Sequence, residues 1–389
     1  MNEKTTISTE EQKAQDTLRS ESLNLLRFPL AVVVICAHIL KTSGYRVRGE
    51  LLTLDQYPLT REISHAFDAF FRGQSVPIYF FISGYVFFVG ITLTREKYKQ
   101  KMQNRSKSLL IPFLFWNTLF ILISLVAYMP WFADLFRGHA HNWLDVSVSS
   151  ILYSYWDAAY GIFQPPSIPD NDNAIYPHCI PLWFLRDLMI VAVSTPVIYW
   201  ILKRTKSYVV WGLGAVWFVE SFFGLYHVNQ LLTAFFFFTW GAYMSINKKD
   251  MLREFGRFRK PSIAIYIGLS LLYIAAVHWN PEAATVIKQM NIVVGLLCAY
   301  NVSSYLLEHH ICQPNKFLAS ASFFMYVSHF LTLEYLEKIL FVVVSPASAA
   351  GMMAVCGLTL LITLAGWLTL FRLMRRYTPG VLKVIAGRK

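Results

Sequence analysis

Long apolar runs are the feature of this sequence that most constrains its fold. About 20 apolar residues span the hydrocarbon core of a bilayer as a helix, and only 15% of this chain is charged, against about 25% in soluble domains. The sequence therefore predicts an all-α polytopic membrane protein, a bundle of about ten transmembrane helices. The ninth run is long, so we expect its helix to be tilted or broken. The ten runs lie at residues 23–41, 75–93, 108–130, 182–202, 208–223, 227–246, 261–279, 284–307, 316–344 and 349–371.

The distribution of basic residues predicts the orientation of these helices. If the N-terminus is cytoplasmic, the cytoplasmic loops include "TREKYKQKMQNRSK", "KRTKS" and "NKKDMLREFGRFRK". The opposite loops are poor in Lys and Arg: residues 131–181 hold only Arg137, and "GLYH", "NPEA" and "SPASAA" hold none. Lys and Arg are retained on the cytoplasmic side, so we expect a cytoplasmic N-terminus and a cytoplasmic C-terminus. The outer loop 42–74 is an exception, since it holds four arginines, Arg46, Arg48, Arg61 and Arg72.

This topology divides the chain into three parts. Residues 1–22 are polar and have no signal-peptide pattern, so we expect a cytoplasmic N-terminal tail. Residues 23–375 form the transmembrane domain, and residues 376–389 form a basic cytoplasmic tail. The outer loop 131–181 is expected to be a lid or a cap over a site, because long loops in compact domains are commonly functional. The net charge of +12 follows the topology, and it favours contact with anionic membrane lipids over nucleic acid.

The first apolar run, "LLRFPLAVVVICAH", is bracketed by Arg27 and His38. Eleven residues separate them, which is three helical turns plus about 20°, so both side chains leave nearly the same face, roughly 16 Å apart along the axis. An ionisable group inside a membrane costs about 2.5–3.5 kcal/mol on insertion scales and so marks a functional site by default. Arg27 could also reach the cytoplasmic interface, and His38 could be a hydrogen-bonded core residue, but the shared face favours a polar path through the membrane.

Other ionisable residues in the runs have structural explanations. Glu334 and Lys338 are four residues apart and are expected to pair. Glu220, His278 and Lys288 lie near predicted helix ends, from which they can reach the interface.

Two further segments hold candidate site residues. In "VPIYFFISGYVFF", Ser83 and Gly84 lie mid-membrane, where small residues allow close helix packing. In "NRSKSLLIPFLFW", Arg105 and Lys107 precede the third run on the cytoplasmic side. They are positive-inside residues by position, and together with Arg27 they would suit a polyanionic ligand such as a phosphorylated cofactor.

The outer end of the fourth run, "PLWFLRDLMIV", places Trp183, Arg186 and Asp187 at the membrane interface. Trp183 could be an anchor of the aromatic belt, and adjacent Arg and Asp side chains point in different directions on a helix, so we expect separate partners. His329 in "MYVSHF" is either a site residue or a core residue. We expect no metal, because "HAH" at His139 and "HHIC" at His309 lack the further ligands of a closed zinc site.

In these motifs the chain resembles acyltransferase family 3, the integral-membrane acyltransferases that O-acylate bacterial surface sugars. The matching stretches run in order from about residue 22 to residue 375: "LRFPLAVVVICAH", "VPIYFFISGY", a basic segment before "LLIPFLFW", then "LWFLRDL", "FFFFTWGAYMS" and "ASFFMYVSHF". Members often carry Arg-x-x-Arg before the third helix, whereas this chain has Arg105 and then Ser108, with Lys107 between them.

The resemblance implies transfer of an acyl group, most often acetyl, from a coenzyme A thioester to a hydroxyl of a glycan or a lipid-linked sugar in the bacterial inner membrane. It implies that Arg27, Arg105 and Lys107 hold the CoA phosphates and that His38 is the general base, assisted by Arg27. Ser83, Trp183, Arg186, Asp187 and His329 are then the candidate substrate-binding residues. The rival interpretation is a transporter or flippase for a glycan or lipid-linked sugar, which would use the same polar face without acyl transfer.

Overall fold

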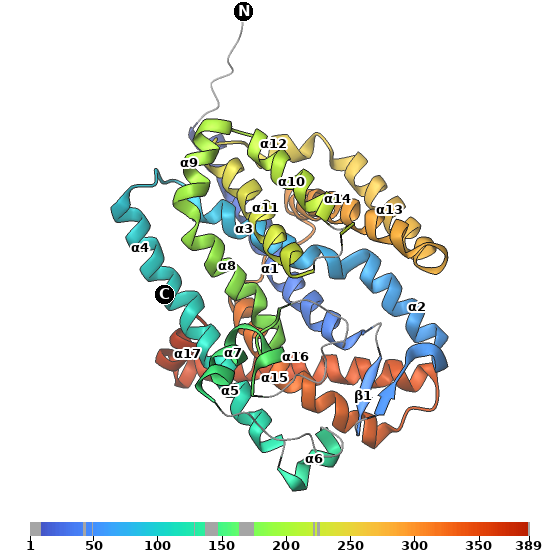
Figure 1. The fold of residues 1–389 in the computed structure, drawn as a ribbon. Helices are drawn as coiled ribbons and strands as arrows, with labels where there is room; N and C mark the ends of the chain where they lie inside the picture. The colour runs from blue at the N-terminus through green and yellow to red at the C-terminus, as the bar shows by residue number, and fades with distance from the viewer. Residues whose placement is uncertain are drawn as a thin grey trace, which may run out of the picture.

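The computed structural model describes residues 9–41, 44–48, 50–127, 129–136, 147–162, 175–220, 222–223 and 226–387 (Figure 1). Apart from one hairpin, in which β1 (Tyr45–Val47) pairs antiparallel with β2 (Glu50–Leu52), its regular structure is helical, which confirms the predicted helical class. Short π-helical turns at Asp68–Arg72 and Ser106–Leu110 precede α3 and α5. The helices are α1 (Thr9–Ile39), α2 (Pro58–Phe67), α3 (Gly73–Phe88), α4 (Arg95–Arg105), α5 (Ile111–Ala127), α6 (Pro130–Phe136), α7 (Val148–Trp156), α8 (Trp183–Val193), α9 (Thr195–Thr205), α10 (Tyr208–Glu220), α11 (Tyr226–Ile246), α12 (Met251–Gly256), α13 (Arg259–Trp279), α14 (Pro281–Glu308), α15 (Lys316–Val344), α16 (Ala349–Tyr377) and α17 (Pro379–Ile385).

Each of the ten apolar runs lies largely on a helix or a pair of helices. Among the described residues, five helices are long and apolar enough to cross a membrane, and a bent pair, α8 with α9, makes a sixth if it counts as one span. The five are Lys13–Ile39, Arg95–Ala127, Arg259–Trp279, Pro281–Glu308 and Ala349–Tyr377. The helices α10 and α11 are apolar but shorter within the described residues. This composition is that of a multi-pass membrane protein.

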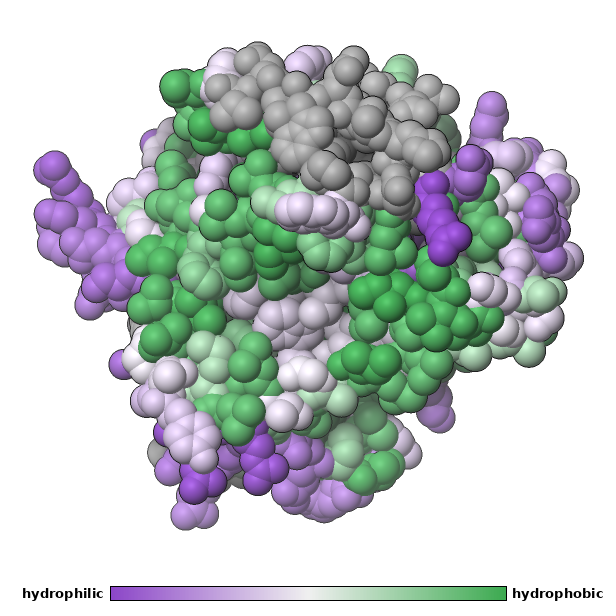
Figure 2. Space-filling model, turned by 90° about the horizontal axis from the view of Figure 1, so that it is seen from below, coloured by the Kyte–Doolittle hydropathy of each residue, from purple (hydrophilic) through white to green (hydrophobic). Residues whose placement is uncertain are grey.

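The outer surface of the bundle is strongly apolar. Only 22% of the most apolar window of Arg259–Trp279 is buried inside the protein, and large side chains such as Trp211 and Leu361 are mostly exposed. Figure 2 shows hydrophobic residues over much of one face, with hydrophilic residues gathered towards its edges. A soluble protein rarely exposes such a surface, so lipid is its natural surrounding.

Two runs differ from expectation in their continuity. The fourth run is broken: α8 and α9 meet at 61°, next to Pro196, which lacks a backbone N–H and disfavours helical geometry in the residue before it. The ninth run, expected to be tilted or broken, is the single helix α15. Of the two predicted alternatives, a break does not occur, because no Gly or Pro interrupts the 29 residues of α15, and a tilt stays a prediction.

Close packing of α3 on α11 depends on glycines from both helices. A Cβ atom on Gly84 would lie 2.0 Å from the backbone oxygen of Phe238, and one on Gly241 would lie 2.0 Å from that of Phe81. The helix-packing interpretation of Gly84 is therefore confirmed.

The segments that the charge pattern assigns to opposite sides lie at opposite ends of the molecule. In Figure 1, the hairpin lies at the lower right and α2 at the right, whereas α9 and α12 lie at the top and α4 at the left. The long helix α1 connects the two ends, since it begins beside α12, where Arg19 contacts Asp250, and ends just before the hairpin.

Candidate active site

Two cavities lie along α1, one near each of its polar residues. The outer cavity, of about 430 Å³, is lined by His38 of α1 and by Lys41, which lies two residues beyond the end of that helix. The inner cavity, of about 380 Å³, is lined by Arg27 of α1. The helix is continuous between the two residues, with Pro29 inside it, and a regular helix of this length separates them by roughly 16 Å along its axis. The two candidate residues thus belong to two neighbouring cavities.

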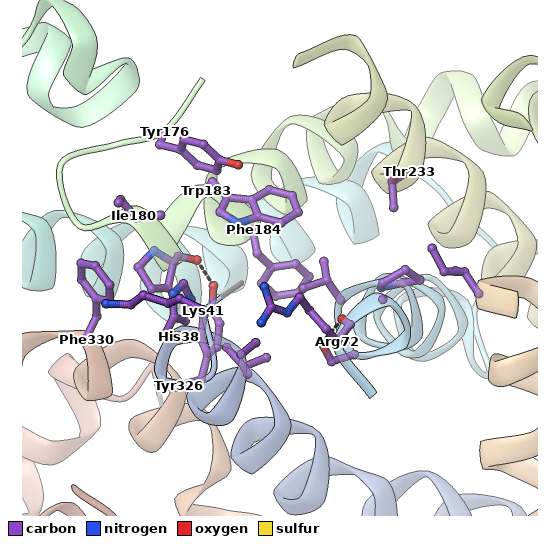
Figure 3. Close-up of a pocket in the computed structure, with 18 of the residues that line it drawn as sticks. His38, Lys41, Arg72, Tyr176, Ile180, Trp183, Phe184, Thr233, Tyr326 and Phe330 are labelled. Atoms are coloured by element: carbon purple, nitrogen blue, oxygen red, sulfur yellow. Dashed lines mark hydrogen bonds between the residues drawn. The ribbon is translucent and has the colours of Figure 1, made fainter. Parts of the chain in front are cut away.

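The outer cavity is built from α1, α3, α8, α10, α11, α14, α15 and the segment before α8 (Figure 3). Aromatic rings make up a large part of its apolar wall, from Tyr176, Trp183, Phe184, Trp217, Tyr326 and Phe330. The lining also includes polar groups, among them Thr233 and Gln289. Such a mixture of rings and a few polar groups is typical of a small-molecule site.

The imidazole of His38 is available for chemistry. It borders the outer cavity, packs edge-on against Phe330 with ring centroids 5.3 Å apart, and forms no hydrogen bond with another described side chain or backbone group. A histidine whose nitrogens are not committed to the protein can exchange a proton with a ligand.

His329 lies directly behind His38, with ring centroids 5.5 Å apart. It is fully buried, and its Nδ1 lies 2.7 Å from the backbone oxygen of Tyr326. Because a carbonyl oxygen only accepts, Nδ1 carries the hydrogen and Nε2 has a free lone pair, for which the described residues offer no partner. His329 does not line the outer cavity, so the structure places it beside the candidate base.

Two cations of the outer cavity were not among the predicted site residues. Lys41 Nζ lies 2.6 Å from Glu337 Oε2. Arg72 Nε lies 3.0 Å from Asp68 Oδ1, and Arg72 also donates to the backbone oxygen of Leu40 at the end of α1. The sequence contained an indication of each cation. Glu337 lies in an apolar run, where a carboxylate requires a cation such as Lys41, and Arg72 is one of the four arginines that depart from the positive-inside pattern.

Pairing with acidic residues also explains part of the excess of arginines in the outer loop 42–74. Arg61 lies 3.3 Å from Asp55, so two of the four arginines in loop 42–74 are paired with acidic residues of the same loop. Acidic partners lower the net charge that must be translocated.

The inner cavity combines two guanidinium groups with hydroxyls. Arg27 of α1 and Arg105 at the end of α4 both line it, and neither forms an ion pair with a described residue. Four serines, Ser83, Ser108, Ser320 and Ser322, add hydroxyls to the wall. Lys107 is exposed and is not part of the described lining of either cavity. The rest of the lining is largely apolar. Two cations without an ion-pair partner among the described residues, beside several hydroxyls, suit a phosphate-bearing ligand with an apolar portion.

A thin wall separates the two cavities. Phe184 of α8 and Tyr326 of α15 line both of them. The Tyr326 hydroxyl donates to the backbone oxygen of Pro181, and the Phe184 ring packs on Phe80 with centroids 4.6 Å apart. A ligand that reached from the inner to the outer cavity would pass beside these two rings.

Arg186 and Asp187 lie outside the described lining of both cavities. The expectation of separate partners was wrong, because Arg186 Nε lies 2.8 Å from Asp187 Oδ1. The long arginine side chain bends round the helix to its neighbour, and Nη1 donates to the backbone oxygen of Trp156, 2.8 Å away. The pair is buried and ties the start of α8 to the end of α7.

The remaining ionisable residues are mostly paired. The predicted contact between Glu334 and Lys338 is confirmed, at 2.7 Å. His278 lies 3.0 Å from Glu62 of α2, and Lys288 lies 2.9 Å from Asp68. Glu220 is buried instead of reaching the interface.

Only part of the predicted lid can be assessed. Within loop 131–181, residues 137–146 and 163–174 lie outside the described residues, and so does the "HAH" motif. The end of the loop does contribute to the outer cavity, through Tyr176, Ile180 and Pro181. Across the described part of the chain, no group of three or more His, Cys, Asp or Glu residues could hold a metal ion.

The comparison with known families agrees with this geometry. Residues 20–371 match the family model of the acyltransferase domain of acyltransferase family 3. The chain belongs to this acyltransferase family. It is therefore an acyltransferase, and the resemblance seen in the sequence motifs is confirmed.

A curated protein is also similar to this chain over most of its length. The succinoglycan biosynthesis protein ExoH of Rhizobium meliloti (strain 1021) is 20% identical over 329 residues, which cover 82% of this chain and 81% of the relative. No solved structure matches the chain.

Proposed function

We propose that this membrane acyltransferase transfers an acyl group, with acetyl favoured, from acyl-CoA to a hydroxyl of a cell-surface or lipid-linked glycan. The observation that carries the proposal is the pair of cavities along one face of α1, with cations in one and an uncommitted histidine in the other. The name of the similar protein from Rhizobium meliloti refers to succinoglycan biosynthesis, which supports a glycan as acceptor.

The inner cavity is the donor site in this proposal. Arg27 and Arg105 bind the phosphates of CoA, since guanidinium groups form strong paired hydrogen bonds with phosphate oxygens. Lys107, exposed beside the cavity, attracts the same phosphates from solvent. Ser83 and the other wall hydroxyls offer partners to the amides of the pantetheine arm, which extends along α1 towards His38.

The outer cavity is the acceptor site. Sugar rings have apolar C–H faces that pack on aromatic rings, and Trp183, Tyr176 and Trp217 provide such rings there. The buried pair of Arg186 and Asp187 positions the helix that carries Trp183.

Chemistry takes place where the cavities meet, beside Phe184 and Tyr326. His38 accepts the proton of the acceptor hydroxyl as its oxygen attacks the thioester carbonyl, so a C–O bond forms and the C–S bond breaks. The proton then passes from His38 to the CoA thiolate, and free CoA leaves. Direct transfer of this kind needs no nucleophile from the protein. His329 packs against the His38 ring from behind, with ring centroids 5.5 Å apart, and so limits where that ring can lie.

The proposed location is the bacterial inner membrane, with about ten membrane helices and both termini in the cytoplasm. In this orientation α4 and the inner cavity face the cytoplasm, where CoA thioesters are made. The outer cavity then faces the opposite side, where surface glycans are displayed.

The test uses membranes that contain the wild type or His38→Ala, supplied with acetyl-CoA labelled in the acetyl group and with cell glycan. We expect release of free CoA and labelled glycan from the wild type, and a rate lower by about 10²–10⁴ in the variant, as is usual for loss of a general base. His278→Gln is the matched control, because His278 lies on the outer side against Glu62 and outside the described lining of both cavities.

A His38→Ala variant with full activity at normal expression would refute the assigned base. Movement of sugar without consumption of thioester would favour the transporter alternative. Mass spectrometry of surface glycan from cells with and without the gene would name the acyl group and the acceptor together.

A further inference from the structure

The last helix of the chain lies beyond the part that matches the family. The match ends at residue 371, whereas α16 continues to Tyr377 and α17 spans Pro379–Ile385. In Figure 1, α17 folds back beside α5 instead of extending away from the bundle. The sequence alone indicated only a basic cytoplasmic tail in this region.

The end of α17 borders the inner cavity. Ala386 and Gly387, directly after the helix, line this cavity together with Arg27 and Arg105. Gly387 lies against the backbone of Ser108, which also lines this cavity.

This position is held by specific contacts. The buried Trp116 of α5 donates from Nε1 to the backbone oxygen of Ile385, 2.9 Å away. Leu382, Ile385 and Ala386 are buried as well. A helix anchored in this way is part of the folded domain.

The backbone at Gly387 approaches the π-helical turn before α5 too closely for any side chain. Its φ is +59°, and a Cβ atom there would lie 2.2 Å from the backbone oxygen of Ser108. That oxygen lacks its usual helical partner, because the residue four positions later is Pro112, which has no N–H. The glycine therefore lets the end of the chain close against an irregular turn in the cavity wall.

We propose that the C-terminal segment 379–387 is a wall of the acyl-donor site, which sets the width of the channel for the pantetheine arm of acyl-CoA. This inference rests on the proposed function of the inner cavity. Displacement of segment 379–387 changes the width of that channel and therefore weakens donor binding. The same displacement does not alter the outer cavity or His38, because the segment lines only the inner cavity.

The test compares Gly387→Ala with Gly380→Ala, in the purified protein in lipid nanodiscs. The first variant adds a methyl group against the Ser108 carbonyl, whereas a Cβ on Gly380 meets nothing within 4 Å. The measurements are the Kd for radiolabelled CoA and the KM values for acetyl-CoA and for glycan. We expect Gly387→Ala to raise the Kd for CoA and the KM for acetyl-CoA about tenfold, with the KM for glycan unchanged, and Gly380→Ala to behave as wild type.

Equal CoA affinity in both variants would overturn the proposal. If Gly387→Ala does not fold, a chain that ends after Thr378 replaces it, because it removes the segment without a steric clash. If this shortened protein folds and binds CoA weakly, the result supports the proposal that segment 379–387 is a wall of the donor site. If it binds CoA as tightly as the wild type, or if it does not fold, the proposal is overturned and α17 has another role. Failure of the wild type itself to bind CoA would instead overturn the donor assignment in the proposed function.

Discussion

At the scale of single residues, neighbours in the sequence have different surroundings. Arg105 and Lys107 are two positions apart, but Arg105 lines the inner cavity while Lys107 is exposed outside its described lining. Ser83 and Gly84 are adjacent, but the serine lines the same cavity while the glycine packs against Phe238. The π-helical turn that begins at Ser106 adds to this separation, since it changes the angle at which following side chains leave the helix.

The first prediction concerns donor binding by Arg105. Arg105→Ala should raise the KM for acyl-CoA about 10- to 100-fold, because a hydrogen bond to a charged group contributes about 1.5–3 kcal/mol. Lys107→Ala should have a smaller effect, since an exposed charge is screened by solvent and salt. Steady-state kinetics with varied acyl-CoA measures both.

The control for the Arg105→Ala and Lys107→Ala variants is Lys97→Ala, which removes an exposed cation from α4, the helix that ends at Arg105. Its KM should equal that of the wild type. A KM for Arg105→Ala as low as that of the Lys97 variant would show that the inner cavity does not bind the donor phosphates.

At the scale of elements, α3 positions residues of both cavities. Its first residues, Gly73 and Ser75 among them, line the outer cavity, and Tyr79 and Ser83 line the inner one. Pro77 leaves the backbone oxygen of Gly73 without its usual helical donor, so the helix offers a free carbonyl near the outer cavity. The close contact of α3 with α11 through Gly84 and Gly241 fixes this whole arrangement.

The second prediction concerns that contact. Gly84→Ala should destabilise the protein by about 1–3 kcal/mol or more, because the added methyl group meets backbone atoms that cannot move independently. Thermal unfolding in detergent should show a lower Tm.

Gly268→Ala in the lipid-exposed helix α13 is the matched control, since a Cβ there meets nothing within 4 Å. The substitution should leave the Tm unchanged or raise it, because Ala favours helix over Gly. Identical Tm values for the two variants would contradict the close approach of α3 and α11.

At the scale of the whole molecule, the proposed function requires the two cavities to be exposed on opposite sides of the membrane. In that proposal the donor comes from the cytoplasm and the acceptor lies beyond the membrane, which requires the basic loops near α4 and α12 to be cytoplasmic. The broken span of α8 and α9 and the short helices α10 and α11 make this bundle irregular, with five to six full-length spans among the described residues.

The third prediction tests this orientation with cysteines at two exposed positions. Glu282→Cys, at the start of α14, should react with a membrane-impermeant thiol reagent in intact spheroplasts. Arg257→Cys, after α12, should react only once the membrane is permeabilised. Both variants are made in a background in which the partly exposed Cys36 and Cys312 are replaced by Ser. Labelling in the reverse order would overturn the proposed topology.

The sequence by itself determined the helical class, the apolar character of the helices, the family and the pairing of Glu334 with Lys338. All of these depend on local periodicity, composition or spacing within one helix, and such properties can be recognised from a short stretch of consecutive residues. The common face of Arg27 and His38 belongs to the same kind of information. Of the ten predicted transmembrane helices, five or six are long and apolar enough to span a membrane among the described residues.

Only the tertiary structure decided which polar groups meet. Lys41 with Glu337, Arg72 beside His38, and the end of α17 against Ser108 are all contacts between segments far apart in the chain. Spacing along one helix cannot reveal them, because they depend on how separate helices cross and on where Gly and Pro let backbones approach. The division of one polar face into two cavities, with Phe184 and Tyr326 between them, arises from that packing.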